Sequence, residues 1–215
     1  MKRIAWAWAI AFVLACGTAA AGNIELPADG DSYSALVAKA AAHDASVDFR
    51  ALRFAYLDSK AFEGAGKQFE TADTLRRAMF AAARSGDDAA VRANAEKILS
   101  IDYTDLWAHK LLRQSCAALK DDACAELHHF VEFGLLDSII HSGDGKTCAT
   151  GWEAVQISEE YFVLGMMGVH FEQQSLVNAG GHNCDAMQGT DDKGAGVTTY
   201  FNIDAMMAAE AKQFQ

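Results

Sequence analysis

Proline is almost absent from this chain, since Pro27 is the only one among 215 residues. This absence excludes a proline-rich linker or tail. Basic residues are also scarce, with 18 lysines and arginines against 29 aspartates and glutamates. The negative balance argues against nucleic-acid binding, which needs a basic surface, and against docking on anionic lipid headgroups.

Long hydrophobic runs are missing beyond the N-terminus, so no transmembrane span is expected after processing. Residues 1–21 have the pattern of a secretory signal peptide: Lys2 and Arg3 precede an apolar stretch at 4–15 that is too short to span a bilayer. Small residues at 19–21 fit a signal peptidase site. The mature chain then starts near Gly22 and carries 16 basic and 29 acidic residues, a net charge of −13. We expect a periplasmic or secreted protein.

A second interpretation of the same segment remains open. Val13-Leu14-Ala15-Cys16 resembles a lipoprotein processing box, in which Cys16 would become a lipidated first residue that anchors the protein to the envelope. The small residues at 19–21 favour a soluble product, whereas the position of Cys16 favours the anchor.

Cysteines are few, and four remain after processing: Cys116, Cys124, Cys148 and Cys184. In an exported chain they suggest two disulfides, for which three pairings exist. We favour Cys116–Cys124, which flank the turn of a helical hairpin, and Cys148–Cys184, near the starts of two expected strands. A zinc site is the alternative, but the chain has no Cys-x-x-Cys pair, and neither a metal nor a cofactor is predicted.

The periodicity of apolar residues changes near Gly143. Residues 22–142 show helical spacing and residues 143–215 mostly strand-like alternation, which predicts an α+β fold in one compact domain, 22–215. Residues 60–67 contain Gly64 and Gly66 and are expected to form a loop. The helices are expected to begin or lie near residues 32, 49, 75, 88, 104 and 122.

The helical half contains a weak repeat. Gly86-Asp87-Asp88-Ala89 lies 34 residues before Lys120-Asp121-Asp122-Ala123, which is about the period of the tetratricopeptide helical hairpin. Residues 89–119 resemble part of such a repeat, although Tyr103 stands where proline is usual. We expect tetratricopeptide-like hairpins that pack on the C-terminal sheet.

The C-terminal half predicts an antiparallel sheet of about four strands, at 150–158, 169–177, 182–188 and 197–204, with a short helix or turn at 159–167. One face is apolar and is expected to meet the helices, and the other is polar. The polar set could bind a glycan, a peptide or an envelope protein. It consists of His170, Glu172, Gln174, Tyr200, Asn202 and Asp204.

Six short motifs follow one another along the chain. They are Leu135-Leu136-Asp137-Ser138-Ile139, Ser142-Gly143-Asp144-Gly145-Lys146, Glu159-Glu160-Tyr161, Gln174-Ser175-Leu176, Gly181-His182 with Asp185, and Tyr200-Phe201-Asn202-Ile203-Asp204. In series they resemble an uncharacterised family of exported bacterial proteins, one of the domain-of-unknown-function families. The resemblance spans roughly residues 48–204 and implies no activity. It departs at Cys184, where the family usually has an aromatic residue, so the Cys148–Cys184 bridge would be a local feature.

Catalytic signatures are weak. Residues 143–147 do not complete a phosphate-loop motif, because position 140 is Ile140 and a helix, not a strand, is expected before the turn. Neither His-Glu-x-x-His nor Gly-x-Ser-x-Gly is present. The sequence therefore predicts a non-enzymatic binding protein of the cell envelope. The alternative is a hydrolase-like enzyme at the helix–sheet junction, with His141, Asp144, His182 and Asp185, although His182 and Asp185 should point to opposite faces of a strand.

Overall fold

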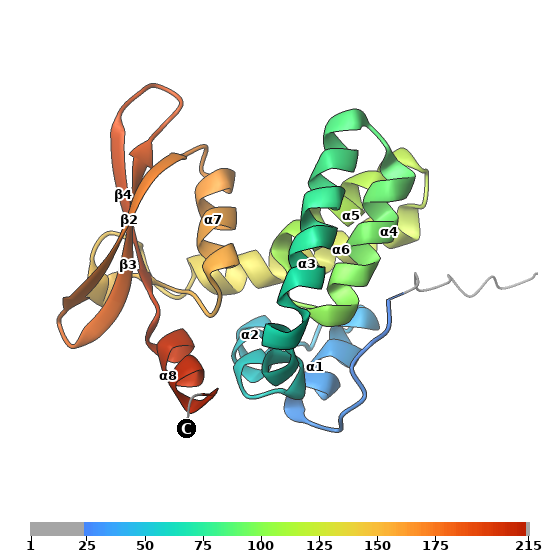
Figure 1. Ribbon diagram of the computed structural model, residues 1–215, viewed down its shortest axis with the longest axis horizontal. Helices are drawn as coiled ribbons and strands as arrows, with labels where there is room; N and C mark the ends of the chain where they lie inside the picture. Colours follow the sequence, from blue (N-terminus) through green and yellow to red (C-terminus); the bar gives the residue numbers. More distant parts are fainter. Residues whose placement is uncertain (1–23, 214–215) are drawn as a thin grey trace, which may run out of the picture.

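The computed structural model describes residues 24–213 (Figure 1). The predicted signal peptide at 1–21 and Cys16 lie outside the described residues. Helices dominate the N-terminal part and a sheet follows, so the expected α+β class is confirmed. No helix within 24–213 is both long and apolar enough to cross a membrane.

Within residues 24–213, six helices precede the sheet, and each begins directly after an aspartate or serine. The side chain of that residue accepts a hydrogen bond from a backbone N–H of the first turn, which an isolated helix start leaves unpaired. The helices are α1 (Ser32–Ala41), α2 (Phe49–Leu57), α3 (Lys60–Ser85), α4 (Asp88–Ile101), α5 (Leu106–Ala118) and α6 (Asp122–Ile140).

The expected loop at 60–67 is wrong, because α3 runs through it. Ser59 caps the helix, and Gly64 and Gly66 both lie within it. Each glycine costs about 1 kcal/mol relative to alanine. The apolar residues at 62, 65, 69 and 72 nevertheless continue the helical spacing across both positions. Gly86, with φ +72°, ends the helix.

Helices α3 to α6 pack successively on one another. The proposed tetratricopeptide-like repeat in this region stays a prediction. The apolar side chains of these helices share one continuous buried cluster with those of the sheet, including Leu99, Leu135, Phe162 and Phe201.

The sheet is mixed and not purely antiparallel. Its strands are β1 (Trp152–Glu153), β2 (His170–Ala179), β3 (His182–Thr190) and β4 (Gly196–Asn202). Their order is β1-β4-β3-β2, and β1 runs parallel to β4. The expected strand at 150–158 shrinks to two residues, because helix α7 (Ile157–Met166) starts within it. The last strand was expected to reach residue 204, but it ends at Asn202, and Asp204 is the first residue of helix α8 (Asp204–Gln213).

A bulge in β2 changes which residues face the helices. The register with β3 shifts between Phe171 and Gln173, so that Glu172 has no partner. An extra residue in one strand reverses the alternation beyond it. Gln174 consequently lies on the face of Asp185 and hydrogen bonds to it at 2.7 Å.

Candidate functional site

A groove separates the first half of α3 from α7 and α8, with a cavity volume of about 260 Å³. In Figure 1, α7 lies beside the sheet on the side of the helical part, where α3 is found. The groove is formed by residues from α2, α3, the α4–α5 connection, the start of α7, and α8. It therefore depends on segments that are distant in the sequence.

One wall of the groove is an apolar stripe on α3. Phe62, Ala65, Phe69 and Ala72 recur every three or four residues, so they share one helix face. Phe69 is 68% exposed, although a large aromatic ring at helical spacing usually packs against a neighbour. Ile157, on the α7 side, is 46% exposed. The groove thus presents apolar surface from two sides.

The floor of the groove is polar. Asp102 is only 7% exposed, and its Oδ1 accepts hydrogen bonds from the backbone N–H and the hydroxyl of Thr104, at 2.8 and 2.6 Å. Gln156 donates to the same hydroxyl at 2.9 Å. Burial, and then the charge of Asp105, raise the pKa of Asp102 to about 6.

Arg76 lies beside this carboxylate and is paired with a different one. Its guanidinium donates to Asp105 at 2.6 Å. Its Nε is buried and has no hydrogen-bond partner among the described residues. A buried polar atom without a hydrogen-bond partner loses the hydration that it has in water, which lowers the stability of the protein. Such atoms are rare in folded proteins, so the floor of the groove is a candidate for binding a ligand.

The sequence could have shown only part of this groove. The spacing of the apolar residues from Phe62 to Ala72 indicates one face of a helix, but Gly64 and Gly66 favour a loop at the same place. Asp102 has the spacing of a helix cap, and the actual cap of α5 is Asp105. The convergence of α3 with α7 and α8 has no local signal.

Among the described residues, the four residues of the hydrolase hypothesis make no hydrogen bond with one another. Each hydrogen bonds elsewhere: His141 with Asp137, Asp144 with Thr150, His182 with Asp204, and Asp185 with Gln174. As expected, His182 and Asp185 have different surroundings. His141 lies at the rim of a wide, open pocket of about 500 Å³ between α2, α6 and β1, where Arg50 and Glu153 already pair with each other.

The predicted polar patch is divided. Tyr200 and Asn202 lie on β4, whereas His170 and Glu172 lie on β2 at the far edge, beyond β3. His170 faces Asp192 at 3.2 Å, Glu172 is the bulge residue, and Gln174 turns to the helix-facing side.

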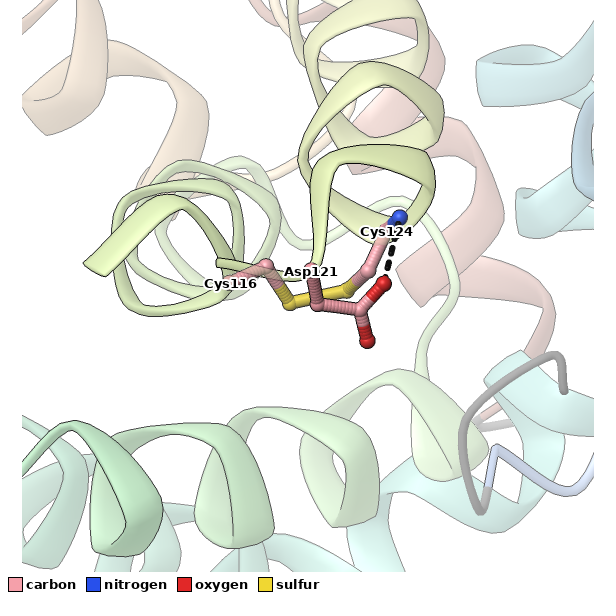
Figure 2. A group of neighbouring side chains, drawn as sticks. All are labelled: Cys116, Asp121 and Cys124. Carbon is pink, nitrogen blue, oxygen red and sulfur yellow. Dashed lines mark hydrogen bonds between the residues drawn. A yellow bond between two sulfur atoms is a disulfide. The ribbon is translucent and has the colours of Figure 1, made fainter. Parts of the chain in front are cut away.

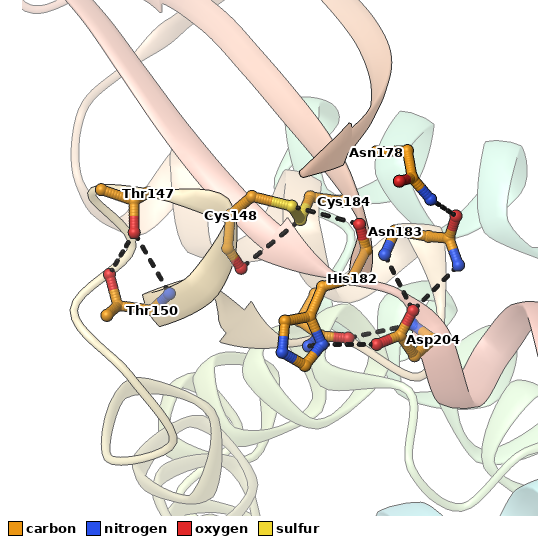
Figure 3. Close-up of a disulfide and its surroundings, with 9 residues drawn as sticks. Thr147, Cys148, Thr150, Asn178, His182, Asn183, Cys184 and Asp204 are labelled. Atoms are coloured by element: carbon orange, nitrogen blue, oxygen red, sulfur yellow. Dashed lines mark hydrogen bonds and ion pairs between the residues drawn. A yellow bond between two sulfur atoms is a disulfide. The ribbon is translucent and has the colours of Figure 1, made fainter. Parts of the chain in front are cut away.

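Asn202 and Asp204 instead gather around His182, next to the Cys148–Cys184 disulfide (Figure 3). Asp204 accepts from the backbone N–H of Asn183 and lies 2.8 Å from the Nδ1 of His182. These contacts, the backbone one first, lower the pKa of Asp204. The His182–Asp204 pair joins β3 to the start of α8, which is a structural role.

A buried pair of carboxyl groups, Glu160 on α7 and Asp185 on β3, was not predicted. Glu160 of α7 is fully buried, and neither of its carboxylate oxygens has a hydrogen-bond partner among the described residues. Burial, and then the nearby charge of Asp185, raise the pKa of Glu160 to about 9. Glu160 is therefore protonated at neutral pH and can donate its proton to Asp185. In the sequence, Glu160 stands out only as part of the motif Glu159-Glu160-Tyr161.

The four cysteines are paired as the sequence favoured. Cys116 bonds to Cys124 and Cys148 to Cys184, with Cα separations of 5.8 and 5.6 Å. Cys116, Cys124 and Asp121 bring potential metal-ligand atoms within 4.8 Å of one another (Figure 2). The two sulfurs are bonded to each other and offer no thiolate, while Asp121 caps α6 and pairs with Arg92 at 2.7 Å. This chemistry does not fit a metal site.

The sequence was compared with curated proteins, solved structures and family models. No curated protein matches the sequence, and no solved structure matches it. One family model, described as a domain of unknown function (DUF4919), matches residues 24–212, which is nearly the whole described structure. The chain belongs to this family of domains of unknown function.

Proposed function

We propose that this protein is a non-enzymatic binding protein of the bacterial cell envelope and that it holds a segment of a partner protein in the groove between α3 and α7. The observation that carries the proposal is the apolar face of α3, where Phe69 is 68% exposed beside a polar floor. Binding sites commonly combine apolar walls with a few convergent polar groups.

The surroundings of the groove support binding over catalysis. Among the described residues, Ser158 is the only serine that lines it, and no histidine or cysteine does. The Ser158 hydroxyl faces Gln156 at 3.5 Å, which is not a base. Nucleophilic catalysis needs a hydroxyl or thiol beside a base. The hydrolase alternative gains no support from His141, Asp144, His182 and Asp185, since each has a different partner.

Export is part of the proposal. The predicted signal peptide supports it, and the two disulfides are compatible with an oxidising compartment. Whether processing yields a soluble chain or a lipoprotein attached through Cys16 does not alter the groove.

The test is a pull-down from crosslinked envelopes of the native host with the tagged mature chain. Phe69→Ala should lose the partner, because it removes the ring that the groove exposes. Phe133→Ala is the matched control, since Phe133 is a 40% exposed phenylalanine on α6, away from the groove. A partner retained by Phe133→Ala and lost by Phe69→Ala supports the proposal. Equal capture by both variants would contradict it.

A further inference from the structure

The carboxylate at the floor of the groove has no cationic partner of its own. None of the ion pairs within residues 24–213 includes Asp102, whereas its neighbour Asp105 is paired with Arg76 at 2.6 Å. Buried charges in proteins are normally paired or bound to a metal, because desolvation is costly. Asp102 is only 7% exposed and still lines the groove.

The hydrogen bonds of Asp102 are made by one of its two carboxylate oxygens. Both hydrogen bonds from Thr104 reach Oδ1. No hydrogen bond within residues 24–213 ends on the second carboxylate oxygen, Oδ2, although the side chain of Gln156 lies close enough to lower the pKa of Asp102. A hydrogen bond between a charged donor and a carboxylate is roughly twice as strong as a neutral one.

The other charged residues of the groove also favour a ligand that carries a positive charge. Among the described residues that line it, the charged ones are Arg76, Asp102 and Glu210. The single cation in this set, Arg76, donates to Asp105 and interacts with Asp102 only through the longer-range attraction of their charges. The remaining two are acidic, in a chain with a net charge of −11. An anionic ligand would meet uncompensated negative charge, and an uncharged one would leave Asp102 unpaired.

Aromatic rings complete the arrangement. Tyr56 and Phe62 line the groove in edge-to-face contact, 5.5 Å between ring centroids, and Phe69 lies further along the same wall. The faces of such rings attract cations. The aliphatic stems of lysine and arginine also pack well on apolar surface while the charged end reaches a polar group.

We propose that the groove recognises a lysine or arginine side chain, presented by an amphipathic segment of a partner protein, with the carboxylate of Asp102 as its counterion. The inference rests on the proposed function, because it names the chemistry of the partner in the same groove. The apolar residues of the segment lie along Phe62, Ala65 and Phe69. Its cationic side chain enters the floor beside Tyr56.

Defined peptides test this chemistry directly. The probes are acetylated and amidated twelve-residue leucine–lysine peptides with apolar residues at helical spacing, and the same peptides with every lysine replaced by glutamine. Calorimetry with the full mature chain should show tighter binding of the lysine peptide. Asp102→Asn keeps a side chain that can accept from Thr104, and it should weaken the lysine peptide by about tenfold or more, to the level of the glutamine peptide.

Two further variants keep the result interpretable. Asp137→Asn removes an exposed aspartate on α6 and should leave the affinity unchanged, which excludes a general effect of net charge. Glu210 is exposed on α8 and lines the groove, so Glu210→Gln leaves the core intact and should weaken the lysine peptide by about two- to fivefold. Cadaverine serves as the free-amine probe, and binding as tight as that of the peptide would show that no protein segment is needed and would overturn the assignment of the partner.

The failure of this inference can be separated from the failure of the proposed function. If lysine and glutamine peptides bind equally, and Phe69→Ala weakens both, the groove binds segments without regard to charge, and only the role of Asp102 is overturned. An unchanged affinity of Asp102→Asn for the lysine peptide would have the same meaning. If Phe69→Ala leaves every affinity unchanged, the groove itself is not the site and both proposals fail.

Discussion

The guanidinium of Arg53 and the carboxylate of Glu159 form a buried, two-pronged ion pair between α2 and α7. The two hydrogen bonds measure 2.7 and 2.8 Å, and the side chains are 0% and 2% exposed. Arg53 also donates to the carbonyl of Glu153 at 2.5 Å, and the backbone N–H of Val155 donates to Glu159 at 2.8 Å. This pair fixes α7, and with it one side of the groove, to the helical half.

Breaking the Arg53–Glu159 pair should destabilise the whole protein. Glu159→Gln leaves a buried, uncompensated guanidinium, and we expect the free energy of unfolding to fall by about 3–5 kcal/mol. Urea denaturation measures the change. The matched control is Glu153→Gln, which breaks the exposed Arg50–Glu153 pair between α2 and β1. Exposed pairs contribute about 0–1 kcal/mol, so an equal loss in both variants would refute the special role of Arg53.

The carboxyl of Glu160 should make stability depend on pH in an unusual direction. Its pKa is about 9 in the folded protein against an ordinary value of 4.5, so the folded state binds more protons than the unfolded state between these values. Stability from this group is full below pH 4.5 and is lost as the pH rises toward 9, at up to about 1.4 kcal/mol per pH unit.

Glu160→Gln should remove this contribution, because glutamine does not titrate. The unfolding free energy of the wild type, measured between about pH 5 and 9, should therefore fall more steeply than that of the variant. Glu172→Gln, at the exposed bulge of β2, provides a control that should follow the wild type. Parallel curves for the wild type and Glu160→Gln would show that the carboxyl pair does not share a proton.

The contact between α2 and α6 requires a glycine. A Cβ at Gly134 would overlap the ring of Phe49. Gly134→Ala should therefore cost about 1–3 kcal/mol, the usual range for overpacking. Gly66→Ala is the control, because nothing lies within 4 Å of the added carbon in α3. It should stabilise the helix by up to about 1 kcal/mol. A loss of stability at Gly66 would indicate that residues 60–67 are not helical in solution.

The two disulfides should differ in their contribution to stability. Cys148–Cys184 links residues 36 apart, whereas Cys116–Cys124 links residues 8 apart. In the chain-entropy model their removal costs about 4 and about 2.5 kcal/mol, respectively. Guanidinium denaturation of the two double alanine variants measures this difference. Non-reducing peptide mapping checks the pairing itself, and a peptide linking Cys116 to Cys148 or Cys184 would refute it.

Much of the local structure could be predicted from the sequence. Aspartates before apolar stripes mark the starts of helices because their side chains accept the unpaired N–H groups of the first turn. Alternation between 169 and 177 marks β2, and the turn between Cys116 and Cys124 brings these cysteines together. Each of these features depends on residues that are close in the chain, where spacing alone fixes the geometry.

The candidate sites could not be predicted in the same way. The bulge at Glu172, the burial of Glu160 beside Asp185, and the groove around Asp102 all join elements that are distant in sequence. Local spacing also gave the wrong result at 60–67, where packing and the cap at Ser59 outweigh two glycines. The sequence by itself determined the class of fold, the starts of most of the N-terminal helices, α3 excepted, and the favoured cysteine pairs. Only tertiary structure decided which carboxylates are buried without a cation, because burial depends on what the rest of the chain packs against them.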